Sequence, residues 1–147
     1  MASVLTNYCE EWIQRAAMQD LEPTSIECAL YNDGTDALGE GSDVEDITTE
    51  PSGDAYVGQS ITVPDNVTFS LDGSNNLQVD IDDQTYDTSD SSQTVDSYFL
   101  VVNFQATVVT ADNDTTNHLV LTGALSQSRD LSQIDNLQVN NMGGTLD

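Results

Sequence analysis

The sequence predicts a mainly β protein, an antiparallel β-sandwich preceded by one amphipathic helix. Three observations support this fold class. Apolar residues repeat at helical spacing only near the start of the chain, short apolar runs follow from residue 25 onward, and Gly, Asn and Asp turns separate the runs. A length of 147 residues suits one such domain. We therefore expect a helical arm over residues 1–22 and a sandwich over residues 23–147.

The helix is expected over residues 3–18, because apolar residues there recur every four positions in two adjacent rows. The rows contain Val4, Tyr8, Trp12, Ala16, Leu5, Cys9, Ile13 and Ala17. Ser3 suits the N-cap, and Pro23 ends the region. The apolar stripe would pack either on the sandwich or on a neighbouring subunit. For the second alternative, Tyr8, Trp12 and Ile13 are the candidate contact residues.

The strands that follow are expected over residues 25–31, 55–63, 66–71, 77–81, 97–109, 117–126 and 136–142, with no further helix. Residues 66–81 show the clearest pattern, since two alternating runs flank a Gly/Asn turn and predict a hairpin with one buried face. Its inward residues would be Val67, Phe69, Leu71, Leu77, Val79 and Ile81. Residues 83–96, rich in Asp and Ser, are expected to be a polar connection.

The charge balance is the most unusual feature of the composition. The chain has 26 acidic residues, two arginines and no lysine, for a net charge of −24. Such a chain repels nucleic acid and anionic lipid, which basic clusters would bind. Acids spread over the whole length suit molar salt, where the Debye length falls to about 3 Å. We therefore expect a haloarchaeon or one of its viruses as the source.

Motifs for catalysis or metal binding are weak, so we expect no enzyme, no cofactor and no metal site. The sequence lacks a nucleophile elbow and a phosphate-binding loop, and its single histidine, His118, is interpreted as a surface or edge residue. No acidic segment has the glycine and glutamate positions of an EF-hand. An irregular cation site at Asp112–Asp114 with Asp130 remains an alternative, although hairpin turns explain the same residues.

No segment resembles a signal peptide, and no apolar run is long enough to span a membrane. The two cysteines, Cys9 and Cys28, have no metal-ligand spacing. They could form a disulfide, but we favour two reduced thiols that fill apolar space.

Four segments carry a resemblance to a known family. They are "ALYND" at 29–33, "ITTEPSGDAYVGQSITV" at 47–63, "VDSYFLV" at 95–101 and "ALSQSRDLSQIDNLQVN" at 124–140. In their order and spacing, the chain resembles the small jelly-roll virion proteins of tailed viruses, which decorate or plug the capsid or form turrets on it. The resemblance covers about residues 25–142. Val63 stands where the family often has Trp, and Ser97 where it has Gly.

The resemblance implies a jelly-roll fold and a structural role in the virion of a haloarchaeal tailed virus. The protein would be a homo-oligomer on the capsid exterior, assembled in a high-salt host cytoplasm, and would bind the major capsid protein or other virion proteins. Tyr31, at the end of the first strand, joins Tyr8, Trp12 and Ile13 as a candidate contact residue. A tail or baseplate component is an alternative. A second is a host-side carbohydrate-binding module, which would need exposed aromatic residues such as Tyr56, Tyr86 and Tyr98.

Overall fold

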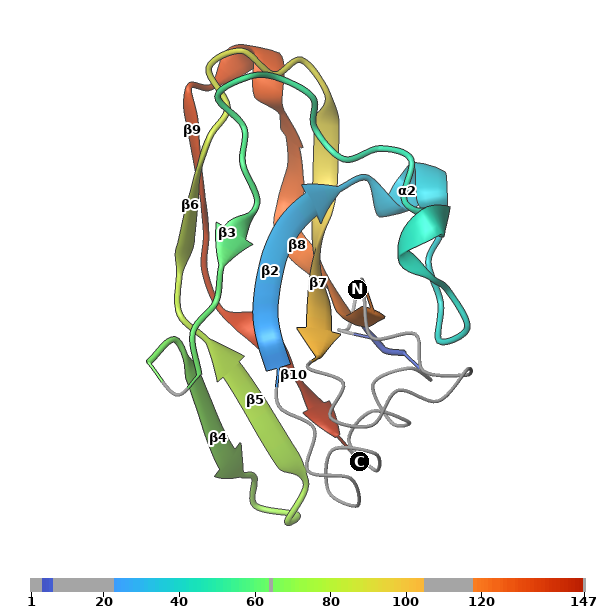
Figure 1. Ribbon diagram of the computed structural model, residues 1–147, viewed down its shortest axis with the longest axis vertical. Helices are drawn as coiled ribbons and strands as arrows, with labels where there is room; N and C mark the ends of the chain where they lie inside the picture. The colour runs from blue at the N-terminus through green and yellow to red at the C-terminus, as the bar shows by residue number, and fades with distance from the viewer. Residues whose placement is uncertain (1–3, 7–22, 64, 105–117, 147) are drawn as a thin grey trace.

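The computed structural model describes residues 4–6, 23–63, 65–104 and 118–146, which form a mainly β, antiparallel fold in two layers (Figure 1). The first layer is one sheet with the strand order β1-β8-β7-β2-β3. Its strands are β1 (Val4–Leu5), β2 (Pro23–Tyr31), β3 (Gln59–Ser60), β7 (Thr94–Phe104) and β8 (His118–Asp130). The long β7–β8 hairpin and β2 form its centre, and β3 pairs with only Glu27 and Cys28 of β2.

The second layer contains two small antiparallel sheets. One has the order β10-β5-β4, built from β4 (Val67–Leu71), β5 (Leu77–Ile81) and β10 (Met142–Leu146). The other pairs β6 (Gln84–Asp87) with β9 (Asn136–Val139). Because β5 leads into β6 and β9 into β10, the two sheets are one ribbon, interrupted at residues 82–83 and 140–141. Asn141 has a φ of 56°, a left-handed conformation that Asn tolerates well.

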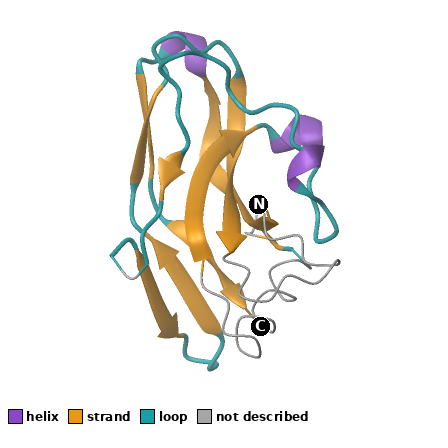
Figure 2. Ribbon diagram, viewed as in Figure 1, coloured by secondary structure: helices purple, strands orange, loops and turns teal. Residues whose placement is uncertain are grey.

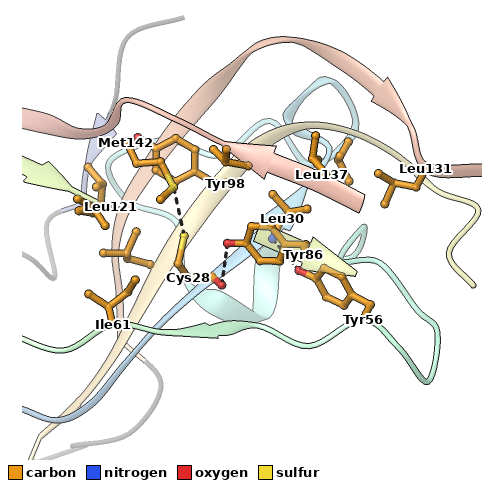
Figure 3. Packing of buried hydrophobic residues seen from close by; sticks show 14 of the residues in the cluster. Cys28, Leu30, Tyr56, Ile61, Tyr86, Tyr98, Leu121, Leu131, Leu137 and Met142 are labelled. Carbon is orange, nitrogen blue, oxygen red and sulfur yellow. Dashed lines mark hydrogen bonds between the residues drawn. The ribbon is translucent and has the colours of Figure 1, made fainter. Parts of the chain in front are cut away.

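The main core lies between the layers and draws on nearly every strand (Figure 3). From the first sheet it takes Cys28, Leu30, Val95, Tyr98, Leu100 and Leu121. Opposite them lie Val67, Ile81, Tyr86, Leu137, Val139 and Met142. Burial of this apolar surface is the dominant stabilising contribution to such a fold.

The first sheet is also apolar on its outer face. Ala29, Tyr31, Phe99, Val101 and Leu119 form a second cluster there, and the segment after β2 covers it with Leu38, Val44 and Ile47. This segment contains the short helix α2 (Asp33–Asp36) and the 3-10 helix η1 (Val44–Asp46), and Figure 2 shows them beside the sheet. A further 3-10 helix, η2, spans Leu131–Gln133. Burial on both faces explains why β2 and β7 read as continuous apolar runs.

The predicted antiparallel β fold is confirmed, and several of its details are corrected. Val4 and Leu5 are strand residues paired with β8, so the predicted helix is wrong at its first turn, and residues 7–22 lie outside the described residues. The expectation of no later helix is wrong because of α2. Only 59–60 of the expected strand 55–63 is strand, and 136–142 is two strands. The expected polar connection at 83–96 contains β6, and Tyr86 is the one residue of that strand whose side chain is buried.

Candidate functional site

The predicted contact residues do not form an exposed surface in the part of the chain that the structure describes. Tyr8, Trp12 and Ile13 lie outside it. Tyr31 has none of its surface exposed, packs edge-to-face on Phe99 with the ring centroids 5.8 Å apart, and donates a hydrogen bond to Asp33. It is therefore a core residue in the second cluster.

The aromatic residues needed for carbohydrate binding are also buried. Tyr56, Tyr86 and Tyr98 are each less than a tenth exposed. Tyr56 and Tyr86 stack with their ring centroids 5.9 Å apart. The Leu30 N–H donates to the Tyr56 hydroxyl at 2.8 Å, and the Tyr86 hydroxyl donates to the Cys28 carbonyl at 3.0 Å (Figure 3). Burial raises the pKa of both hydroxyls, which keeps them neutral, and they serve to connect the layers.

Cys28 is a free thiol that fills core space, as we favoured from the sequence, while Cys9 lies outside the described residues. The sulfur of Cys28 lies 3.8 Å from the sulfur of Met142. Burial raises the pKa of Cys28 to about 11, so the thiol is protonated at neutral pH. A protonated, fully buried thiol cannot act as a nucleophile toward a dissolved substrate.

His118 is buried, which corrects the prediction of a surface or edge residue. It begins β8, opposite Val102 of β7. Strand β8 lies between β1 and β7 in the first sheet, so His118 is not on an edge strand. This burial could not be predicted from the sequence, since an isolated histidine on a strand has no pattern of its own.

No cluster of three or more metal-ligand side chains occurs among the described residues. Of the alternative cation site, Asp112–Asp114 lies outside these residues. Asp130 accepts hydrogen bonds from the Ser132 N–H at 3.0 Å and the Ser132 hydroxyl at 2.7 Å, so it is the N-cap of η2. Within the same residues, no helix is long and apolar enough to cross a membrane.

Backbone and hydroxyl donors, rather than basic side chains, hold the carboxylates around α2. Asp96 accepts from the N–H groups of Asp33 and Gly34, at 2.6 and 3.2 Å. Asp36 accepts from the N–H and hydroxyl groups of both Thr48 and Thr49. Partial burial acts to raise the pKa of Asp36, but these hydrogen bonds outweigh it and lower the pKa. This arrangement fastens the segment that covers the second cluster.

A polar hollow of about 470 Å³ lies beside this segment, between α2 and the start of β7. It is lined by Asn32, Thr35, Thr48, Thr49, Glu50, Ser52, Gln93 and Thr94. Its polar groups already bind one another, as when the Gln93 amide donates to the Ser52 hydroxyl at 2.6 Å. The lining has no aromatic surface on which a sugar could stack. We find no chemistry here that selects a ligand.

Four large apolar side chains are exposed among the described residues, Val57, Val63, Phe69 and Leu71, and the last two lie on β4. Phe69 is 55% exposed and Leu71 is 65% exposed, whereas Val67 on the same face is buried. The predicted hairpin is confirmed, with Val67 opposite Ile81 and Phe69 opposite Val79. The prediction that its whole apolar face is buried is wrong, because the hairpin extends past the end of the main core. This exposed part of β4 is the candidate interface.

Comparison of the chain with known protein families, with characterised proteins and with solved structures finds no match.

Proposed function

We propose that this chain is a structural protein of a haloarchaeal tailed virus, which binds to the capsid as a decoration or turret protein and stabilises it. The observation that carries the proposal is an uncharged strand, β4, that exposes two apolar side chains in a chain of net charge −24. Among the described residues, Cys28, His118 and the tyrosines of the core are buried. Binding, rather than catalysis, is what such a surface suits.

The acidic surface supports the high-salt part of the proposal. With a net charge of −24, the folded chain experiences strong self-repulsion unless ions screen it. In 1 M salt the screening length is about 3 Å, compared with about 10 Å in 0.1 M salt. Acidic surfaces can then approach one another closely enough for apolar contacts to form.

Binding to an assembled shell would stabilise the shell by mass action, because a subunit that binds only the assembled form shifts the equilibrium toward it. Its partners would be the major capsid protein or other virion proteins, together with further copies of the chain. Closed symmetry allows one contact surface to be used many times. The resemblance in residues 25–142 supports this role. We propose a sandwich and not a full jelly roll, because the β4–β5 and β7–β8 hairpins each lie within one layer.

A tail or baseplate location remains the alternative, since it would use the same sandwich and the same exposed strand. The carbohydrate-binding alternative loses its support, because the three tyrosines that it would need are buried.

The salt part of the proposal is tested by circular dichroism during a titration from about 3 M to about 0.1 M KCl, over which the screening length grows several-fold. We expect the β-sheet signal to be lost at low salt and to return when salt is restored. A spectrum that stays unchanged at low salt would contradict adaptation to molar salt.

The virion part is tested by peptide mass spectrometry on particles purified from a high-salt host and separated into heads and tails. Abundant peptides in the head fraction are expected, and their ratio to the major capsid protein would give the copy number. Enrichment in tails would move the protein to the baseplate or fibre attachment. Absence from both fractions would refute a virion role.

A further inference from the structure

Within the part of the chain that the structure describes, no strand pairs with the outer edge of β4. Strand β4 is the outermost strand in the order β10-β5-β4, and Figure 1 shows it at the margin of the molecule. On its inner side, the Asn66 carbonyl accepts from Asp82 at 2.9 Å and the Asp72 N–H donates to Asn76 at 3.0 Å. In an antiparallel ladder these bonding positions alternate. Residues 67, 69 and 71 therefore direct their backbone N–H and C=O groups outward, away from β5.

This edge lacks the protection that exposed edges usually have. Native sheets block them with charged side chains, prolines or bulges. The five residues of β4, "VTFSL", contain none of these, although the chain has 26 acidic residues. Two of its three apolar side chains are more than half exposed. A free edge with outward hydrogen-bonding groups and exposed apolar side chains suits another β-strand as its partner.

We propose that the occupant of this edge is β4 of a second copy of the chain, paired antiparallel about a two-fold axis at Phe69. An interface on a two-fold axis must be complementary to itself, and β4 is. Phe69 would face Phe69 of the second copy, Val67 would face Leu71, and Thr68 would face Ser70. Apolar residues thus meet apolar residues, and hydroxyls meet hydroxyls. Positions 67, 69 and 71 would supply about six ladder hydrogen bonds.

The same register keeps the acids apart. Asp72 would face Asn66 of the second copy and Asp65 would face Gly73, so no carboxylate lies directly opposite another. The two copies of Asp80, on the β5 strands, would be separated by three strand spacings, at least about 14 Å. That distance is several screening lengths in 1 M salt and little more than one in 0.1 M salt. The dimer should therefore form at high salt and dissociate when salt is lowered.

This inference names the surface through which copies of the chain associate, and it rests on the proposed function only for the expectation that they do. Detection of the protein in heads or tails tests the virion role, and the oligomeric state tests the β4 pairing. Each experiment can fail while the other succeeds.

The test is sedimentation of the purified full-length protein over a range of concentrations in about 3 M KCl, where acidic surfaces are screened. A short paired edge predicts a dissociation constant on the order of 10–100 µM. Phe69→Lys removes the apolar contact at the axis from both copies and should weaken the dimer by at least about tenfold. Thr68→Lys introduces the same side chain on the same strand but leaves the Phe69 contact in place, and it should change the constant less than about threefold. Circular dichroism checks that both variants fold.

A chain that stays monomeric at about 1 mM protein, well above the expected constant, overturns the proposal. So does a dimer that Phe69→Lys leaves intact, or one that both lysine variants weaken equally.

A disulfide tests the register directly, in a Cys9→Ser background that leaves only the buried Cys28. Facing residues at position 69 would have Cα atoms about 5.5 Å apart, within the range for a disulfide. Phe69→Cys should therefore give a covalent dimer on mild oxidation in high salt. Thr68→Cys, whose two copies do not face each other, should react much more slowly. Equal rates for the two variants would refute pairing about Phe69.

Discussion

Replacing Tyr56 by Phe should destabilise the protein by about 2 kcal/mol, because the Leu30 N–H loses its acceptor. Strand β3 pairs with β2 only at Glu27 and Cys28, so it ends before it reaches Leu30. The hydroxyl of Tyr56 takes the place of the missing strand and accepts from the Leu30 N–H at 2.8 Å. Leu30 has no exposed surface, so water cannot replace the hydroxyl without opening the core.

The magnitude follows from the cost of a buried donor without an acceptor, which is about 1–3 kcal/mol. For a chain of this size, each kcal/mol lowers the melting temperature by about 2–4 °C. Tyr56→Phe should therefore lower it by about 4–8 °C, since the ring and its stacking on Tyr86 are retained.

Tyr31→Phe is the matched control. It removes the same atom from another buried tyrosine, but its hydroxyl donates to Asp33, which water can reach. The expected loss is below about 1 kcal/mol. Stability should be measured by urea unfolding in about 3 M KCl, because guanidinium is itself a salt and would change the screening. Equal losses in the two variants would refute the assignment of Tyr56 as the acceptor that replaces β3.

Three further predictions concern single side chains. Gly143 has a φ of 142° and lies against the backbone of β5, so Gly143→Ala should cost more than about 3 kcal/mol in urea unfolding. Gly73→Ala, with open space around it, should cost less than about 1 kcal/mol, and equal costs would contradict this account. Hydrogen bonds lower the pKa of Asp36 below 3.8. The stability that its ionised carboxylate contributes is therefore present above that pH and is lost as the pH falls through the folded-state pKa. Asp36→Asn should make the acid loss of stability shallower in urea unfolding, and an unchanged slope would contradict this role of the carboxylate. The pKa of Cys28 rises from 9.0 to about 11, so stability should fall between those pH values, by up to about 1.4 kcal/mol per pH unit, as the thiol ionises only in the unfolded chain. In urea titrations across that window Cys28→Ala should show a shallower fall, and an identical profile would be evidence against burial of the thiol.

Some of the fold could be predicted because the signal is local. The hairpin over residues 66–81 was predicted from alternation and a Gly/Asn turn, and the structure pairs the same residues. The first strand, ending at Tyr31, was predicted from a β-rich run before a turn. Both patterns lie within a few residues of chain, where backbone geometry and side-chain alternation act directly.

Other elements depend on contacts that a local pattern does not contain. Strand β6 has one buried side chain, Tyr86, and exists because β9 pairs with it from about fifty residues further along the chain. In the same way, the expected strand at 55–63 is reduced to two residues. Beyond Cys28, the Tyr56 hydroxyl and not a strand accepts the hydrogen bond from the Leu30 N–H of β2.

The candidate interface shows the same division. The sequence by itself determined the charge of −24, the antiparallel β class and the face of β4 that carries Val67, Phe69 and Leu71. Only the tertiary structure decided which of these residues is covered. Val67 is buried because the first sheet lies opposite it, and Phe69 and Leu71 are exposed because the hairpin continues past the core. Alternation specifies the direction of a side chain, whereas burial requires a second layer opposite it, and the extent of that layer is set by residues far away in the chain.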